Sequence, residues 1–406
     1  MLRPGTNLFT FVMAMSMAIT ALGIDTVLPA FPEIREAMGL AEGSNDIAGL
    51  VTFYLLGSSI GLLPAGLLAD RFGRKPVMYG GLLIYAVGAV AAVFAPSLGV
   101  MFLGRFVWGL GSAGPRVAVM ATMRDSYSGD QMAKQMSFVM AVFILVPAVA
   151  PALGTGLLAI GPWQTIFWVC AGVALLMLGT TTRVPETLPP DGRLAISAKG
   201  VLTGWRAVLA EPGTAGYLVA LTSLFGVFLS YIASSEIILD QVFGLGEWFP
   251  LFFGGVALAM GVGMFTNGRL VERHGMDRMT SRTYVLALAG VGALLVLAVA
   301  TDGEPHFWVF LPVITVVMFA FQMLIPNLNA APMQPLGHIA GTAAAILGMV
   351  PGALGSTIGL IVDRQFDGTI TPLAIAMVIG TLVSFAGWRW AISASRRGSV
   401  RVQASG

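Results

Sequence analysis

The chain has 406 residues, of which 10% are charged and 56% are of hydrophobic types. Ordinary soluble domains carry about 25% charged residues, so this chain cannot cover its whole surface with side chains that suit water. We therefore expect a membrane protein whose outer surface meets the lipid bilayer. The net charge of +2 gives no indication of nucleic-acid binding, and the single cysteine, Cys170, excludes an internal disulfide and a Cys-rich metal site.

Apolar runs long enough to cross a bilayer follow one another along the chain, separated by charged or Pro/Gly-rich breaks. The first run is expected to be a retained span, because its length suits a bilayer crossing and further runs follow without a soluble domain. The pattern predicts an all-α membrane protein with twelve transmembrane helices, at residues 8–28, 46–69, 77–95, 99–121, 135–159, 163–182, 214–238, 249–270, 281–301, 306–326, 338–362 and 371–392.

The longest polar interval, 183–213, divides the predicted helices six and six. We expect an N-terminal six-helix bundle at 1–182, a cytoplasmic linker at 183–213, and a C-terminal six-helix bundle at 214–406 that ends in a short cytoplasmic tail. The charged run 66–75 recurs in weakened form at 268–278, half a chain later. Internal repeats of hydrophobic spans are how many transporters are built.

The distribution of basic residues predicts the orientation. If the N-terminus is cytoplasmic, nearly all Lys and Arg residues fall in inside segments, and only Arg35 and Arg364 fall in outside ones. This positive-inside bias places both termini in the cytoplasm.

Two motifs carry a family resemblance. The run Gly66–Lys75 resembles the loop signature of the major facilitator superfamily, Gly-x-Leu-x-Asp-Arg-x-Gly-Arg-Lys, at every defining position. The run Gly23–Ile34 is similar to the first-helix signature Asp-x-Tyr-Leu-Pro-Ala-x-Pro of the bicyclomycin/chloramphenicol resistance (Bcr/CflA) group of drug:proton antiporters, with Val27 in place of the tyrosine.

Two further runs are similar to antiporter motifs and depart from them in part. Residues 105–111 match Arg-x-x-Gln-Gly-x-Gly, except that Trp108 replaces the glutamine. Residues 147–155 are similar to a motif that ends Gly-Pro-x-x-Gly-Gly, from which Ala150 and Thr155 depart. The departures leave the particular drug open.

The resemblance implies two six-helix bundles that alternately expose a central cavity to the two sides of the membrane. It implies proton-coupled efflux of small amphipathic drugs across the cytoplasmic (inner) membrane of a bacterium, with the proton gradient as energy source and no cofactor. The expected partners are a small-molecule substrate, protons and the lipid bilayer, with no nucleic acid, and the protein is expected to be a monomer.

Charged residues inside the predicted spans are the strongest site candidates, because each costs at least about 2.5–3.5 kcal/mol in the membrane. They are Asp25, Arg105, Arg116 and Glu236. Asp25 and Arg105 lie at similar depth in helices that run in opposite directions, so we expect them to face each other and to couple transport to protons. The alternative is a permanent structural ion pair.

The remaining candidates are more weakly supported. Arg105, Gly109, Ser112 and Arg116 share one helical face that could line the cavity, although Arg116 could instead reach the cytoplasmic interface. Glu236 lies near the outer end of its helix and suits either a gate or surface role or a second protonation or cation site. The predicted substrate cavity residues are Tyr54, Ser112, Arg116, Tyr231, Glu236, Gln322 and Asn327.

The resemblance also implies a conformational switch at the signature loop. Its members would be Gly66, Asp70, Arg71, Gly73, Arg74 and Asp125. The alternative is a basic turn that only sets topology. Pro147, Pro151 and Gly154 are expected to bend the fifth helix, or to serve packing alone.

Other functions remain open. The same fold class suits an exporter or facilitator of a metabolite such as a sugar, amino acid or siderophore, and also a membrane sensor that does not transport. The sequence has no Gly-x-x-x-x-Gly-Lys-Ser/Thr nucleotide loop, its three histidines are dispersed, and no spaced nucleophile and base occur in the spans. An enzyme is therefore not expected.

Overall fold

The computed structural model describes residues 4–41, 44–193, 198–211, 213–336 and 340–405, which form helices and loops without a β-strand. The chain divides into two compact units. Unit 1 comprises Met1–Ser197 with Glu247–Ala257, and unit 2 comprises Ala198–Gly246 with Leu258–Gly406. The division into bundles 1–182 and 214–406 with a linker between them stays a prediction.

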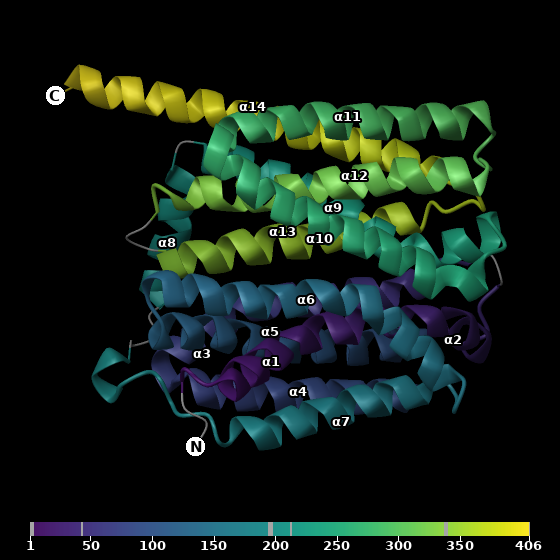
Figure 1. Ribbon diagram of the computed structural model, residues 1–406, viewed down its shortest axis with the longest axis horizontal. Coiled ribbons are helices and arrows are strands. Elements are labelled where there is room, and N and C mark those ends of the chain that lie inside the picture. The colour runs from purple at the N-terminus through teal and green to yellow at the C-terminus, as the bar shows by residue number, and fades with distance from the viewer. Residues whose placement is uncertain (1–3, 42–43, 194–197, 212, 337–339, 406) are drawn as a thin grey trace. The chain divides into compact units, whose positions relative to one another are not determined.

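Unit 1 is built mainly from the first half of the chain. Its helices are α1 (Asn7–Asp25), α2 (Phe31–Ala37), α3 (Gly49–Phe72), α4 (Arg74–Val93), α5 (Leu98–Ser126), α6 (Gly129–Leu158) and α7 (Gln164–Thr181). α5 packs against α3 and α4, α4 also packs against α7, and α1 packs against α6 (Figure 1). Hydroxyl groups cap two of the N-termini, because Thr6 accepts from the Phe9 N–H and Ser97 from the Val100 N–H.

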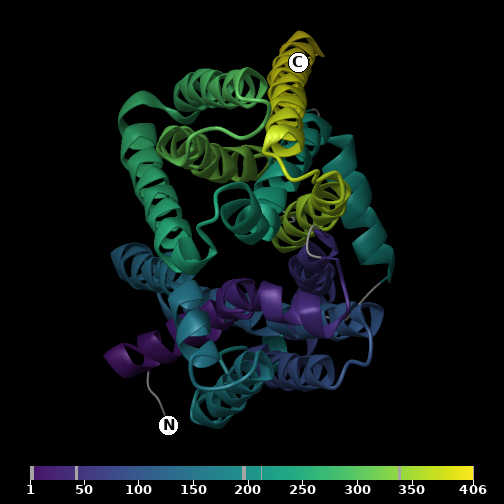
Figure 2. The same ribbon diagram turned by 90° about the vertical axis from the view of Figure 1, so that its right-hand side faces the viewer.

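Unit 2 holds most of the second half. Its helices are α8 (Ala198–Ala210), α9 (Thr214–Ile237), α10 (Phe249–His274), whose first residues cluster with unit 1, α11 (Met276–Ala300), α12 (Phe307–Ala330), α13 (Ala340–Asp363) and α14 (Thr371–Ser405). α9 packs against α13 and α14, and α11 packs against α12 and α14. Figure 2 shows these teal, green and yellow helices more nearly end-on.

The predicted all-α membrane fold is confirmed, and each of the twelve predicted spans has a counterpart among the helices α1, α3–α7 and α9–α14. Eleven helical segments in the described ranges are long and apolar enough to cross a membrane, and α5 is not among them. α5 carries Arg105 and Arg116 and many glycines, which lower its hydropathy. Because it packs against both α3 and α4, it depends less on contact with lipid.

Two helices were not predicted from the sequence, the short α2 and the longer α8. The predicted linker contains α8, whose Val208 is buried in an apolar cluster with Leu336, Ala343 and Ile346. Trp205 packs against the same cluster from one turn earlier on α8. The overall polarity of 183–213 hid this amphipathic spacing, which extends over only a few turns.

A single residue separates α3 from α4. α3 ends at Phe72 and α4 begins at Arg74, and Gly73 between them has φ = 106° and ψ = 165°. Residues with a side chain rarely adopt this backbone conformation, so glycine allows the turn between α3 and α4 to be a single residue long.

Candidate functional site

Arg105 is the central buried charge of unit 1. Its side chain is fully buried, and it donates from Nε to the carbonyl of Leu50 on α3 (2.9 Å) and from Nη1 to the carbonyl of Gly23 on α1 (2.8 Å). The guanidinium also lies over the rings of Tyr54 (4.7 Å) and Trp108 (4.6 Å). Arg105 therefore joins α5 to α1 and α3 through main-chain carbonyls and aromatic faces.

Asp25 is the last residue of α1 and is also buried. The predicted pairing of Asp25 with Arg105 is not made in this structure, because the guanidinium binds Gly23 and Leu50, and no ion pair or hydrogen bond of Asp25 occurs within the described ranges. Arg105 does reach α1 near the depth of Asp25, since it binds the carbonyl of Gly23, two residues before Asp25. Two residues turn an α-helix by about 200°, so similar depth does not bring two side chains together.

α6 and α7 contact the chain immediately beyond Asp25. A Cβ at Gly154 of α6 would overlap the carbonyl oxygen of Thr26, so glycine allows close approach there. The Thr26 hydroxyl lies 3.7 Å from the Cys170 sulfur of α7. The end of α1 is therefore fixed beside Asp25. The predicted bend at Pro147 and Pro151 stays a prediction, and both lie inside the continuous helix α6.

The aromatic side chains of unit 1 meet around Trp108, the residue that replaces the motif glutamine. Its ring packs edge-on against Tyr54 (5.9 Å), Tyr85 (5.3 Å) and Phe167 (5.3 Å). The Tyr54 and Tyr85 hydroxyls donate to α1 carbonyls, at Thr20 (2.9 Å) and Ile19 (3.0 Å). These contacts make the Trp108 cluster part of the helix-packing core.

Two predicted cavity residues belong to that core. Tyr54 is fully buried and hydrogen bonded, and Ser112 is fully buried with its hydroxyl between Ser58 Oγ (3.0 Å) and the Gly109 carbonyl (2.7 Å). Neighbouring helices cover their helical face in this structure, and their place in a substrate cavity stays a prediction. Arg116, further along the same face, is exposed.

The polar candidates of unit 2 are placed as follows. Asn327 was predicted to line the cavity, but it is buried, and its amide exchanges two hydrogen bonds with Asn267 of α10 (2.9 and 3.0 Å). Each of the two side-chain amides thereby donates one hydrogen bond to the other and accepts one from it. Tyr231 and Glu236 on α9 are buried, and Gln322 on α12 is half-buried.

Asp363 was assigned to an outside loop by the sequence and is instead a buried group of unit 2. It ends α13, and its Oδ1 accepts from Ser230 (2.5 Å) and Ser234 (2.9 Å) of α9. The predicted span stopped one residue short of it. The spacing of Ser230 and Ser234, four residues apart on one helical face, is a sequence signal for such a polar contact.

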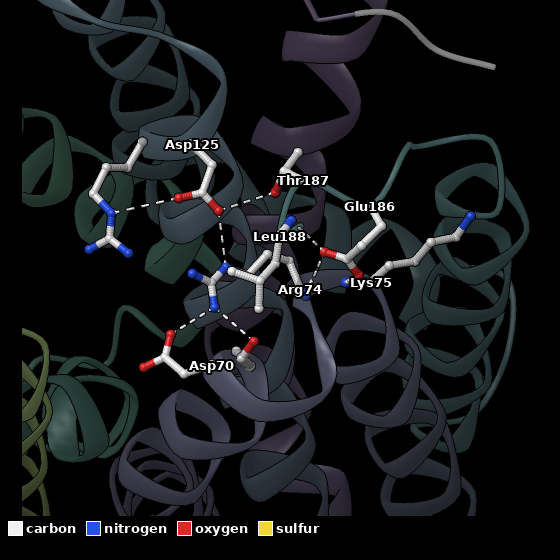
Figure 3. Close-up of polar contacts among 9 residues, drawn as sticks. Asp70, Arg74, Lys75, Asp125, Glu186, Thr187 and Leu188 are labelled. Carbon is white, nitrogen blue, oxygen red and sulfur yellow. Dashed lines mark hydrogen bonds and ion pairs between the residues drawn. The ribbon is translucent and has the colours of Figure 1, made fainter. Parts of the chain in front are cut away.

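The signature loop forms an ion-pair network around Arg74 (Figure 3). Arg74 donates from Nη1 to Asp70 Oδ1 (2.7 Å) and to the Ala69 carbonyl (2.7 Å), and from Nε to Asp125 Oδ2 (3.1 Å) at the end of α5. Arg124 lies 3.9 Å from the other Asp125 oxygen. The guanidinium is buried, so α3, α4 and α5 are joined by a charge that has two carboxylate partners.

Not every predicted switch residue takes part in this network. Asp70, Gly73, Arg74 and Asp125 come together, whereas the Arg71 side chain is exposed and lies over the Phe72 ring (5.4 Å). Gly66 is half-buried, and a Cβ there would meet open space. Whether the network switches with conformation stays a prediction.

Sequence reasoning missed the acid that completes the loop. Glu186, in the predicted linker, accepts from the backbone N–H groups of Arg74 (3.0 Å), Lys75 (3.0 Å) and Leu188 (3.0 Å). Burial raises the pKa of its carboxyl, but the N–H bonds outweigh burial and hold the pKa below its ordinary value. A lone acid in a loop has no periodic signal, so nothing in the sequence pattern selects Glu186.

The fold and these sites define a multi-pass helical membrane protein with charges buried inside its bundles, as in transporters. A sequence model of the Major Facilitator Superfamily matches residues 13–360, and the chain belongs to that superfamily. It is therefore a membrane transporter and not an enzyme. In the described ranges no three His, Cys, Asp or Glu side chains form a group that could hold a metal ion.

Relatives and solved structures agree with this assignment. The chain is 26% identical over 381 residues to a bicyclomycin resistance protein homolog of Haemophilus influenzae, covering 92% of this chain and 94% of that protein. It is 28% identical over 331 residues to the multidrug resistance protein MdtL of Escherichia fergusonii, covering 80% and 81%. The crystal structure of a D-xylose-proton symporter shares the fold, with a TM-score of 0.76 at 15% identity, covering 95% and 98%.

Proposed function

We propose that this transporter exports small amphipathic drugs in exchange for protons, by alternating access across the cytoplasmic membrane of a bacterium. Both termini would lie in the cytoplasm, as the distribution of basic residues predicts. The names of the bicyclomycin- and multidrug-resistance relatives support the drug class. The energy source would be the proton gradient, with no cofactor.

The observation that carries the proton coupling is the buried carboxyl group of Asp25. It lies in a membrane helix and has no cationic partner in the described part of the chain. An unpaired buried carboxylate is costly, so the group is best accommodated with a bound proton or beside a cationic substrate. Exchange of one for the other is the chemistry that an antiporter requires.

The transport cycle follows from that exchange. A proton enters from outside and binds the Asp25 carboxylate. When this proton is released to the cytoplasm, Asp25 becomes a carboxylate again. A cationic or polarised drug then neutralises that carboxylate. The Arg105 guanidinium stays bound to main-chain carbonyls and fixes the position of α1 beside the exchanging group. Asp70, Arg74 and Asp125 would control inward opening at the cytoplasmic end.

Proton flux in everted vesicles tests the proposal. We expect a drug added to vesicles with an imposed proton gradient to cause proton release, and Asp25→Asn to abolish that release. Asp302→Asn, the same change at an exposed position, is the matched control. Drug export that is unaltered in Asp25→Asn would overturn the role of Asp25, and flux with a sugar, amino acid or siderophore panel but no drug would support metabolite export.

A further inference from the structure

The start of the linker is bound to the signature loop by several independent contacts. Glu186 Oε1 accepts the backbone N–H of Arg74, and Oε2 accepts that of Lys75, each at 3.0 Å. These N–H groups belong to the first two residues of α4 and have no partner inside the helix. A carboxylate at a helix N-terminus also interacts favourably with the helix dipole.

Gly73 makes room for this carboxylate. A Cβ at Gly73 would overlap Glu186 Oε2, in addition to the strain of its positive φ. The glycine of the signature loop therefore meets two requirements, a short turn between α3 and α4 and the close approach of the linker.

Neighbouring residues extend the contact along α4 and into the ion-pair network. Lys75 Nζ donates to the Thr182 carbonyl (2.8 Å), and the Tyr79 hydroxyl donates to the Thr181 carbonyl (3.1 Å). The Thr187 hydroxyl donates to Asp125 Oδ2 (3.2 Å), the same oxygen that accepts from Arg74 Nε. Figure 3 shows Thr187 beside Asp125 and Glu186 beside the backbone of Arg74 and Lys75.

The other end of the linker is anchored in unit 2. Val208 of α8 is buried against Ala343 and Ile346 of α13, and a Cβ at Gly204 would contact the Thr342 side chain. The linker is thus held to unit 1 by polar contacts and to unit 2 by apolar ones.

We propose that Glu186 is a positioning residue that clamps the linker to the N-terminus of α4, and that this clamp sets the rate at which the transporter changes conformation. The clamp holds Arg74 between Asp70 and Asp125, and its release frees the loop to change shape. It touches neither Asp25 nor Arg105, so it governs the rate of the conformational change and not substrate affinity. The second part of this proposal rests on the alternating-access function proposed above.

Hydrogen exchange of the purified full chain in lipid nanodiscs tests the clamp without a substrate. The amide protons of Arg74 and Lys75 report on Glu186 directly, because their hydrogen bonds end on its carboxylate. In Glu186→Gln we expect their exchange to speed up about tenfold, as suits the loss of bonds to a charged acceptor. Asp191→Asn removes the same charge from an exposed linker position and should leave the exchange unchanged. Unchanged exchange in Glu186→Gln overturns the clamp.

Transport kinetics test the second part. Glu186→Gln should change the maximal rate of drug export at least about threefold with KM unchanged, and Glu186→Asp, which keeps the charge, should restore part of the difference. A change in KM alone would overturn the conformational role. If Glu186→Gln fails to fold, Glu186→Asp still separates the outcomes, because its shorter side chain must weaken protection of the α4 amides. Faster exchange in a protein that moves no drug would uphold the clamp and reject the proposed function.

Discussion

The guanidinium of Arg105 binds the carbonyl oxygen of Gly23 at 2.8 Å, and Asp25, two residues later on the same helix, keeps its carboxyl group free of any ion pair in the described ranges. Two nitrogens of the Arg105 guanidinium bind main-chain oxygens, which do not titrate, and its plane lies over aromatic faces, while Nη2 has no hydrogen-bond partner in the described ranges. Its position therefore does not depend on the protonation state of Asp25. This separation lets the carboxyl group gain and lose a proton while the helix contacts around it persist.

Asp25→Asn should leave the protein as stable as before, or more stable. A structural ion pair with Arg105 would give the opposite result, a loss of about 3–5 kcal/mol, because removing one partner leaves a buried charge uncompensated. Thermal unfolding in detergent, followed by tryptophan fluorescence, distinguishes the two. A markedly lowered Tm would reject the unpaired state of Asp25.

Arg105→Lys should destabilise unit 1 by about 2–4 kcal/mol. A lysine ammonium cannot reproduce the planar fork that reaches both carbonyls and stacks on two rings, and hydrogen bonds to charged groups are worth about 1.5–3 kcal/mol each. Arg116→Lys, on the exposed part of the same helix, should stay within about 0.5 kcal/mol. Equal effects of the two changes would contradict the special environment of Arg105.

Trp108→Leu should lower the free energy of unfolding by about 3 kcal/mol. The smaller side chain leaves a cavity between Tyr54, Tyr85 and Phe167, and the closely packed helices around it cannot move together to fill that cavity. The matched change is Trp168→Leu on α7, where the ring is 47% exposed, and it should have little effect. Denaturation midpoints of the two variants provide the measurement. A tolerant Trp108 would mean that its aromatic contacts contribute little to helix packing.

The Glu186 clamp should be insensitive to pH in the physiological range. Its folded pKa is below the ordinary value of about 4.3, so its contribution to stability is fully present above that value and is lost as pH falls through the lowered pKa. Protection of the Arg74 and Lys75 amides should therefore match at about pH 6 and about pH 8, once intrinsic exchange rates are corrected. Protection lost between those pH values would contradict this prediction.

Gly73 and Glu186 should show strong coupling in a double-mutant cycle. Gly73→Ala suffers both the positive φ and the overlap with the Glu186 carboxylate, whereas in Gly73→Ala with Glu186→Ala only the backbone strain remains. The double variant should thus be less destabilised than the two single effects added together. Additive effects in thermal unfolding would show that the carboxylate does not occupy this space.

The helices could be predicted from the sequence because apolar length is a one-dimensional property, and bilayer thickness fixes how long each run must be. Asp70, Arg74 and Asp125 could be selected together because a specific motif marks their loop, although the ion pairs among them were not predicted. The partners of Arg105 could not be predicted, since depth along two helices gives no information about the rotation of each. For the same reason Tyr54, Ser112 and Asn327 were assigned to a cavity although neighbouring helices cover them. Asp363 was missed because a boundary error of one residue moved it from a helix to a loop.

Because Arg105 recognises main-chain atoms, the side chains that it passes are not equally constrained in evolution or engineering. Leu50 contributes only its carbonyl oxygen to the guanidinium, so another apolar residue at this position preserves that bond. Gly23 has no such freedom, since a Cβ there would lie 2.8 Å from the hydroxyl oxygens of both Tyr54 and Tyr85. Substitutions are therefore possible at Leu50 of α3 and excluded at Gly23 of α1, although the same arginine binds both carbonyl oxygens.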